Sequence, residues 1–172
     1  HDLRRINVVG ALLIKGIFYV LFFCGICFLS VHTWAGQAVT ANQEVFSGEM
    51  LEYGKDFISL YDGKNLKVLK KTEVLFWSED FQALKQFETQ ILNFTLTQGE
   101  EAVILESGTL LKGRILSIKG SEVILDLGES GIETVKKSDL LAIYYGGNPA
   151  AVKEFFARIS EKQAETRQEE KR

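Results

Sequence analysis

The chain has 172 residues, with 20 Lys and Arg against 23 Asp and Glu, and its two cysteines and two histidines all precede residue 36. Residues 36–172 therefore contain neither residue type, which excludes a cysteine or histidine nucleophile, a zinc site with these ligands, a haem histidine and a structural disulfide there. The same part has 17 basic and 22 acidic residues and a net charge of −5, so no bulk attraction to nucleic acid or anionic lipid is expected.

An apolar segment occupies residues 16–35, GIFYVLFFCGICFLSVHTWA, and contains no Asp, Glu, Lys or Arg. Twenty helical residues span about 30 Å, the thickness of a bilayer core. Three basic residues precede the segment and none follows until Lys55, so the positive-inside rule places residues 1–15 in the cytoplasm. We therefore expect a single pass through the inner (cytoplasmic) membrane, lipid contact through residues 16–35, and a C-terminal domain in the periplasm or extracytoplasmic space.

A secretory signal is the alternative interpretation of this segment. The tripeptide at residues 33–35, Thr-Trp-Ala, offers a small-residue cleavage site. The uninterrupted apolar run of sixteen residues is slightly longer than the roughly 7 to 15 of a signal. Cleavage near Ala35 would leave a secreted or periplasmic domain, whereas cleavage after Ala41 would remove a strand expected near residues 38–40.

An internal repeat organises the chain beyond the apolar segment. Residues 69–75, LKKTEVL, match residues 135–141, VKKSDLL, at an offset of 66 with like chemistry at every position. A repeat of this length is typical of one supersecondary unit used twice. We expect copies at residues 36–77 and 101–145 to share one fold.

The offset between the copies changes along the chain. It is 66 as far back as Gly54, which aligns with Gly120, and it is 65 before them, where Gly48 aligns with Gly113. One extra residue in a hairpin turn of the second copy, near Lys119, accounts for the change.

Each copy has the pattern of five short strands separated by turns. In the second copy the strands are expected at residues 102–105, 110–118, 122–127, 132–135 and 140–145. Gly48 and Gly113 fall inside the long second strand of their copies, where glycine permits a sharp bend or bulge. Five short, strongly bent antiparallel strands predict a small barrel.

This pattern resembles the small five-stranded barrels of the Sm-like and SH3-like superfold, and residues 106–128 carry most of the likeness. The resemblance implies a mainly β fold with two tandem small antiparallel five-stranded barrels, at residues 36–77 and 93–146. No match to the paired loop motifs through which Sm proteins bind RNA is evident, so no RNA-contact residue is assigned. The layout of a short cytoplasmic start, one span and a small β domain is also similar to inner-membrane clamp subunits of secretion and pilus machines.

Two helices complete the predicted architecture. A linking helix at residues 78–92, with Ser78 as its cap, carries apolar residues spaced by three or four and is expected to pack on the barrels. An amphipathic helix at residues 148–160 starts at Asn148-Pro149, a cap followed by proline at the first helical position. Residues 161–172 form a charged tail.

The apolar face of the C-terminal helix has two possible neighbours. It packs either on the chain's own barrel, the usual role of such a stripe, or on a partner protein. Phe155, Phe156 and Ile159 are therefore the candidate partner contacts.

Other motifs are interpreted as turns. The lysine pairs at residues 70–71 and 136–137 are expected to be solvated, and residues 62–65, Asp-Gly-Lys-Asn, form a β-turn without the further acidic ligands of a calcium loop. No catalytic, metal or cofactor site is assigned.

The sequence predicts a non-enzymatic, membrane-anchored, extracytoplasmic structural or assembly subunit of a larger envelope or membrane protein complex. Its expected partners are membrane lipid and other envelope or membrane proteins, with no nucleic acid and no small-molecule substrate. An Sm-like nucleic-acid-binding module is the alternative, and an unrecognised hydrolase that works without histidine is the third hypothesis.

Overall fold

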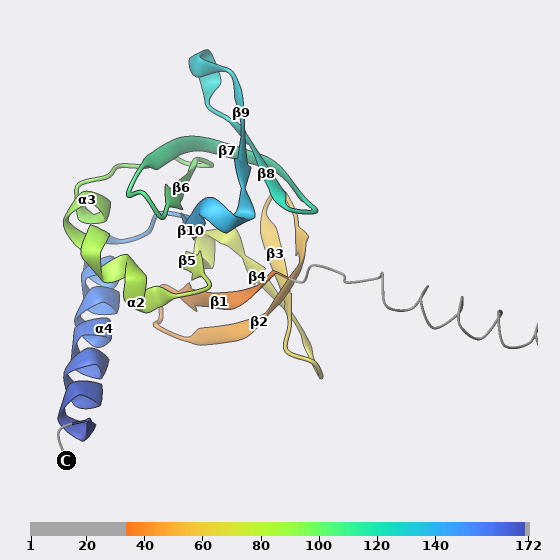
Figure 1. Cartoon of the computed structure of the whole chain (residues 1–172). Coiled ribbons are helices and arrows are strands. Elements are labelled where there is room, and N and C mark those ends of the chain that lie inside the picture. Colours follow the sequence, from red (N-terminus) through yellow and green to blue (C-terminus); the bar gives the residue numbers. More distant parts are fainter. Residues whose placement is uncertain (1–33, 171–172) are drawn as a thin grey trace, which may run out of the picture. The chain divides into compact units, whose positions relative to one another are not determined.

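A single sheet of ten strands dominates the computed structural model, which describes residues 34–170 (Figure 1). All neighbouring strands are antiparallel, and their order is β4-β3-β2-β1-β5-β10-β6-β7-β8-β9. The strands are β1 (Ala35–Thr40), β2 (Val45–Tyr53), β3 (Phe57–Tyr61), β4 (Leu66–Lys70), β5 (Val74–Ser78), β6 (Glu101–Leu105), β7 (Leu110–Lys119), β8 (Glu122–Asp126), β9 (Ile132–Lys136) and β10 (Leu140–Tyr144). The helices are α2 (Phe81–Leu84), η2 (Lys85–Phe87), α3 (Glu88–Leu92) and α4 (Pro149–Glu169), with single turns η1 (Lys71–Glu73), η3 (Gly128–Ser130) and η4 (Lys137–Asp139).

The two copies of the repeat form the two halves of this sheet. In the first half the strands lie in the order β4-β3-β2-β1-β5. In the second half the equivalent strands follow in the reverse order, β10-β6-β7-β8-β9. The halves meet where β5 pairs with β10, with Trp77 opposite Ile143. Because these two residues are equivalent at the offset of 66, an approximate two-fold axis passes between them. The copies thus share one strand order, as the repeat predicts.

The prediction of two separate five-stranded barrels is wrong. Strands β5 and β10 pair with each other, so the two halves become one continuous sheet whose edges are β4 and β9. The inner faces of both halves contribute to one hydrophobic core, made of Trp34, Ala38, Ile58, Leu60, Leu69, Val74, Trp77, Val103, Ile115, Val123, Leu125, Val135, Leu140 and Ile143. A barrel of about 60 residues buries little apolar surface alone, and sharing a core removes that limit.

The extra residue of the second copy lies in the turn between β8 and β9, and its predicted place near Lys119 is wrong. In the first copy the corresponding turn is closed by a hydrogen bond from Asp62 N–H to the Asn65 carbonyl. In the second copy the bond runs from Leu127 N–H to the Gly131 carbonyl, one residue farther along the chain. The offset therefore remains 65 through β3 and β8 and becomes 66 at β4 and β9, which also misaligns the predicted third strands by one residue.

Glycine is required where the second and third strands of each copy approach most closely. A Cβ atom added to Gly48 in β2 would lie 2.7 Å from the Tyr61 carbonyl oxygen in β3. At the equivalent Gly113 in β7, an added Cβ would meet the carbonyl oxygen of Asp126 in β8. Any side chain would push these strand pairs apart, so the mid-strand glycines allow the bend that the sequence predicts.

The helices cover the other face of the central strands (Figure 1). The linking segment begins at Asp80, whose carboxylate accepts hydrogen bonds from the N–H groups of Gln82 and Ala83 at 2.8 and 3.3 Å. Ser78, the predicted cap, instead lies in β5, where its buried hydroxyl donates to the Leu141 carbonyl of β10 at 2.7 Å. Ser78 therefore ties the two halves together.

The long helix α4 starts as predicted, because the Asn148 side chain accepts a hydrogen bond from Ala150 N–H at 2.9 Å and proline follows the cap. The helix continues to Glu169, so most of the predicted tail is helical and exposed. Phe155, Phe156 and Ile159 are buried against the chain's own sheet, with exposures of 4%, 0% and 5%. Of the two neighbours considered for this apolar face, it is the chain's own sheet on which the face packs.

The predicted membrane segment lies almost wholly outside the described residues. Trp34 is buried in the shared core and Ala35 opens β1, so these two residues belong to the folded domain rather than to an anchor. The rest of that segment, at residues 16–33, precedes the described part. Within residues 34–170 no helix has the length and apolar character needed to cross a bilayer.

Truncation of the helix face should destabilise the whole domain. We expect Phe156→Ala to lower the free energy of unfolding by about 3 to 5 kcal/mol, because it leaves a cavity beneath α4. Glu165→Ala, an exposed substitution on the same helix, should change it by less than about 0.5 kcal/mol. Urea unfolding in mild detergent measures both, and equal midpoints for the two variants would contradict the packing of α4.

Candidate functional site: a groove between the sheet and the helices

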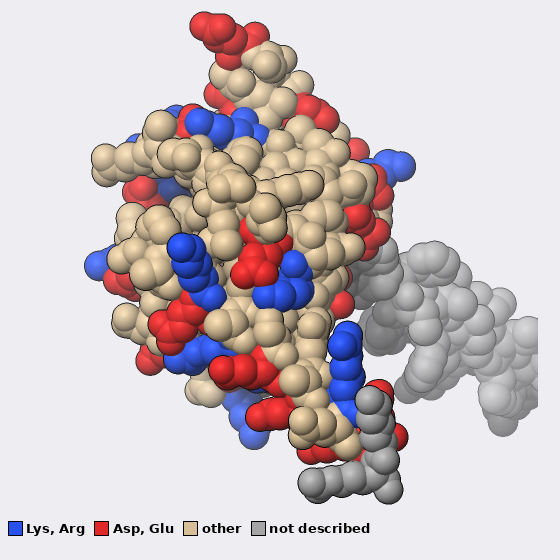
Figure 2. Space-filling model, turned by 90° about the vertical axis from the view of Figure 1, so that its left-hand side faces the viewer, with Lys and Arg blue, Asp and Glu red and all other residues tan. Residues whose placement is uncertain are grey.

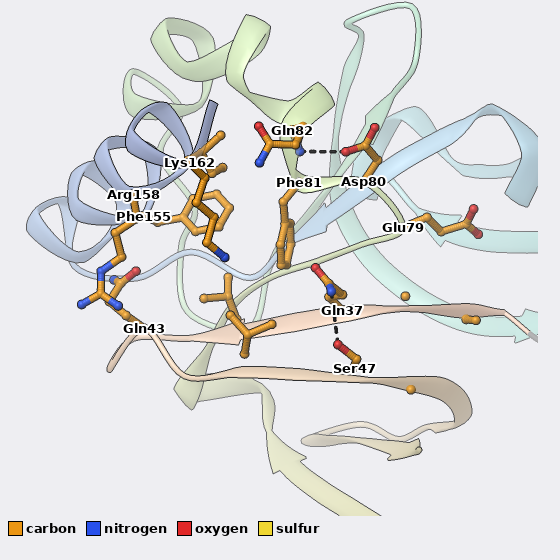
Figure 3. Close-up of a pocket in the computed structure, with 16 residues that line it drawn as sticks. Gln37, Gln43, Ser47, Glu79, Asp80, Phe81, Gln82, Phe155, Arg158 and Lys162 are labelled. Atoms are coloured by element: carbon orange, nitrogen blue, oxygen red, sulfur yellow. Dashed lines mark hydrogen bonds between the residues drawn. The ribbon is translucent and has the colours of Figure 1, made fainter. Parts of the chain in front are cut away.

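A candidate site within residues 34–170 is a groove of about 660 Å³ beside the helical layer (Figure 3). One wall is the outer surface of β1 and β2, and the other is formed by α2, the residues just before it and the second part of α4. Its lining comprises Ala35, Gly36, Gln37, Val39, Gln43, Val45, Ser47, Gly48, Glu79, Asp80, Phe81, Gln82, Phe155, Arg158, Ile159 and Lys162.

Two side-chain hydrogen bonds hold the strand wall in place. Gln37 Nε2 donates to Ser47 Oγ at 3.1 Å, which joins β1 to β2 across the surface of the groove. Gln43, in the turn between these strands, has a φ of +66° and donates from Nε2 to the Ala151 carbonyl at the start of α4 at 2.9 Å. The turn and the helix therefore form one unit, and the groove has rigid sides.

The floor of the groove is apolar. Val39, Phe155 and Ile159 belong to the buried cluster below it, and Phe81 stands edge-on to Phe155 with ring centroids 5.2 Å apart. Val45 is 49% exposed and lines the same groove. This combination provides apolar surface that a ligand can cover.

The two ends of the groove carry opposite charges. Glu79 and Asp80 lie at the α2 end, and Arg158 and Lys162 project from α4 at the other end (Figure 3). Arg158 also pairs with Glu154 on the outer side of α4 at 2.7 Å. A ligand with its own charges in the opposite order would be oriented along the groove.

Within residues 34–170, the surface of the second half that is equivalent to Val45 is more covered. The counterpart of Val45 is Leu110, which is partly buried against the same apolar cluster as Phe94 and Leu96. These two residues belong to the connection between α3 and β6, a chain segment that the first half does not supply within the described residues. Among the described residues, Leu110 is therefore more covered than its counterpart Val45.

Two of the three predicted contact residues, Phe155 and Ile159, show their edges to the groove, whereas Phe156 lies beneath it. The remaining groove residues were not predicted. Their convergence depends on the pairing of β1 with β2 and on the direction of α4, neither of which has a local sequence signal.

A second notable cluster is a buried ion pair between the halves. Lys71 Nζ lies 2.7 Å from Glu101 Oε1, and the two side chains are 11% and 8% exposed. The other carboxylate oxygen of Glu101 accepts a hydrogen bond from Ile115 N–H at 2.9 Å, and the Lys71 amine lies 3.7 Å from the centre of the Tyr53 ring. Lys71 was predicted to be a solvated turn residue, and the structure corrects this.

The equivalent place in the first half is built differently. Gly36 is the counterpart of Glu101, and Lys137, the counterpart of Lys71, lies over the Trp34 ring at 4.9 Å. Met50, the counterpart of Ile115, donates its N–H to the Trp34 carbonyl at 3.0 Å. A carboxylate thus replaces a backbone carbonyl as the acceptor, and comparison of the repeats at Gly36 was the one available signal for it.

Two tyrosines enclose the ion pair from the core side. The rings of Tyr53 and Tyr145 are stacked with centroids 6.4 Å apart. Burial raises the pKa of both phenols well above the ordinary value, and Glu101 adds to the effect by repulsion. Burial also lowers the pKa of Lys71, although hydrogen bonding and attraction to Glu101 oppose this change.

The cluster borders a pocket of about 300 Å³ whose rim includes Lys55 and Arg114. At its base, the charges of Lys71 and Glu101 already satisfy each other, which is typical of a structural pair. No group of three or more potential metal ligands gathers within residues 34–170.

Comparison of the chain with protein family models and with curated proteins finds no match in either case. The functional argument therefore rests on the geometry of the groove and of the sheet.

Breaking the buried pair should be costly because it leaves one charge without its partner. We expect Lys71→Met to lower the free energy of unfolding by about 3 to 5 kcal/mol. Lys70→Met, next in sequence but with a side chain that is 75% exposed, should have an effect below about 0.5 kcal/mol. Urea unfolding of the two variants tests this, and equal stability would show that the pair contributes nothing.

Acid should weaken the connection that leads into β6. Hydrogen bonds from Thr97, aided by Lys112 at 3.1 Å, lower the pKa of Glu100 from 4.5 to about 2. The stabilising effect of the carboxylate is therefore complete above pH 4.5 and is lost as the pH falls toward 2.

Glu100→Gln should consequently lose less stability between pH 6 and pH 3 than the parent chain. Urea midpoints at the two pH values provide the measurement. Glu129→Gln, in the exposed turn after β8, serves as the control that removes one carboxylate elsewhere. The same pH dependence in Glu100→Gln and in the parent would contradict the role of Glu100.

Proposed function

We propose that this protein is a non-enzymatic, membrane-anchored, extracytoplasmic assembly subunit that holds a segment of another envelope or membrane protein in its groove. The observation that carries the proposal is the open groove beside β1 and β2, where Val45 is 49% exposed while its counterpart Leu110 is partly buried. An apolar floor supplies binding energy through burial, and the charged ends supply direction.

The chemistry of the groove defines the segment that it would bind. Val45, which is 49% exposed, and the half-buried Phe81 favour apolar side chains at the centre of the segment. Glu79 and Asp80 favour a basic residue at one end, and Lys162 favours an acidic residue at the other. A volume of about 660 Å³ accommodates a few side chains, so the partner would insert a short segment rather than dock a whole domain.

The proposed membrane tether rests on residues 16–33, which remain apolar after Trp34 and Ala35 are assigned to the domain. Eighteen helical residues span about 27 Å, close to the thickness of a bilayer core. The basic residues before this segment support an N-terminus in the cytoplasm and a domain on the other side. Tethering to the same membrane would raise the effective concentration of a membrane-bound partner.

The charge distribution favours a protein partner over a nucleic acid. On the face that carries the helices, positive and negative side chains are interspersed (Figure 2). A phosphate backbone is recognised by a continuous basic surface, whereas a mixture of both signs suits the polar rim of a protein interface.

Disruption of the groove floor should release the partner. The tagged full-length chain is purified from detergent-solubilised native membranes as the parent, as Val45→Asp and as Leu116→Asp. Val45 and Leu116 are 49% and 50% exposed, but of the two only Val45 lines the groove. We expect the amount of co-purifying partner to fall at least about tenfold with the Val45 variant and to stay unchanged with the Leu116 variant.

A photoreactive residue at Ser47 provides the direct assignment. It should form an adduct with a partner peptide that has an apolar centre between opposite charges. Partner recovery that is unaffected by Val45→Asp, or adducts at Ser47 with nucleic acid, would overturn the proposed function.

A further inference from the structure

The outer edge of the first half is strand β4, and it presents backbone groups that have no partner within residues 34–170. The N–H of Lys71 donates to the Asp56 carbonyl at 2.9 Å, and the N–H of Asp62 donates to the Asn65 carbonyl at 3.2 Å. In an antiparallel pair, successive residues of a strand alternate between bonding to the neighbour and pointing away. Residues 67 and 69 therefore bond to β3, while the N–H and C=O groups of residues 66, 68 and 70 point away from the sheet.

The side chains at this edge are apolar and exposed. Leu66 and Val68 share the outer face of β4 and are 60% and 56% exposed, and Tyr61, opposite Leu66 in β3, is 38% exposed. The lysines of the strand have partners within the chain: the Lys67 amine lies 4.6 Å from the centre of the Phe46 ring, and Lys70 lies 4.0 Å from Glu73. The edge thus combines free backbone groups with apolar surface.

The equivalent edge of the second half, β9, is more polar. Thr134 stands in the place of Val68, Glu133 in the place of Lys67, and Asp126 in the place of Tyr61. Polar and charged residues at a sheet edge are a common protection against pairing with another chain. Ile132, the counterpart of Leu66, is itself 70% exposed. The two edges therefore differ in apolar character at Val68 and Tyr61.

We propose that β4 pairs with β4 of a second copy of this chain, antiparallel and centred on Val68, so that two sheets become one. In this register Val68 faces Val68 of the second copy, and Leu66 faces Lys70 of the second copy. The outward N–H and C=O groups of the three residues then bond reciprocally. The surface is self-complementary, as a two-fold symmetric interface requires.

The charges of β4 select this register. A shift by two residues in one direction would place Lys67 directly opposite Lys67 of the second copy, and like charges in that position are destabilising. A shift by two in the other direction would leave Leu66 without a partner inside the strand. In the register centred on Val68, Lys67 faces Leu69 and Lys70 faces Leu66, so no lysine opposes another.

Pairing of β4 with β9 of a second copy is the less suitable arrangement. In its full overlap Val68 would face Thr134 rather than a second valine. Such a contact would also join different surfaces and leave a free edge at each end, which produces open chains of molecules. The symmetric pair closes after two copies.

This inference does not depend on the proposed function, because it uses the edge of β4 and not the groove. A partner in the groove and a second copy at β4 would be bound by different residues. Val45→Asp should leave the dimer intact, and disruption of β4 should leave capture of the groove partner intact.

Proline substitution tests the pairing with a matched control. The N–H groups of Val68 and Thr134 both point away from the sheet, so proline at either position removes no hydrogen bond within the chain. The protein mass of the full-length chain in detergent, measured by light scattering, should be that of a dimer for the parent and for Thr134→Pro. It should fall twofold for Val68→Pro, with circular dichroism showing that the variant is folded.

Disulfide trapping provides an independent test that does not need the proline variant to fold. With Cys24 and Cys27 replaced by Ser, Val68→Cys should form a disulfide-linked dimer in oxidised membranes, because hydrogen-bonded antiparallel pairs place their Cα atoms about 5.5 Å apart. Thr134→Cys should remain uncrosslinked. A monomeric parent, a dimeric Val68→Pro variant, or a disulfide formed between Val68→Cys and Thr134→Cys chains would overturn the proposal.

Discussion

The antiparallel pairing of β5 with β10 determines the rest of this structure. Trp77 and Ile143 face each other at its centre, and every other strand is placed outward from that seam in the same order on both sides. Because the last strand of each copy pairs with its counterpart, neither copy can close on itself. The inner faces of both copies must then complete one core, and the helices that follow each copy must cover the central strands from the other side.

Departures from the internal symmetry mark the places where the halves have different roles. The buried carboxylate of Glu101 replaces Gly36 and holds Lys71 and a backbone N–H together. The exposed Val45 in the groove stands in the place of the partly buried Leu110, and the apolar Val68 stands in the place of Thr134 at the sheet edge. Comparison of the two copies therefore separates two kinds of feature. Features that both copies share build the fold, and features that differ between them indicate function.

Much of the local structure could be predicted from the sequence, because it depends on neighbouring residues. The repeat, the strand pattern, the mid-strand glycines and the Asn148 cap each leave a short-range signal. The joining of the two halves leaves no such signal. Residues 74–78 and 140–144 can either close a barrel or pair with each other, and both arrangements use the same side chains. The place of the extra residue was also ambiguous, because Gly54 and Gly120 align equally well by composition although the hydrogen-bonded turns differ.

The groove could not be predicted from the sequence for a similar reason. Gln37, Ser47 and Arg158 are ordinary polar residues until the chain brings β1, β2 and α4 together. The sequence predicts a solvent-exposed Lys71, because a pair of lysines before a strand is usually exposed. Its partner Glu101 is 30 residues away, so the ion pair leaves no local signal. Long-range pairing created both sites.

The approximate two-fold axis between β5 and β10 is also the arrangement that duplication of a shorter ancestral chain would produce. A chain with one copy could associate with a second identical chain through its last strand, and the result would have this sheet with true symmetry. Fusion of two such genes would keep the pairing of β5 with β10. It would also let each copy mutate independently, whereas in a dimer of identical chains every mutation appears in both copies. Gly36 and Glu101 could then diverge, and one ancestral surface could become a packed core on one side and a groove on the other.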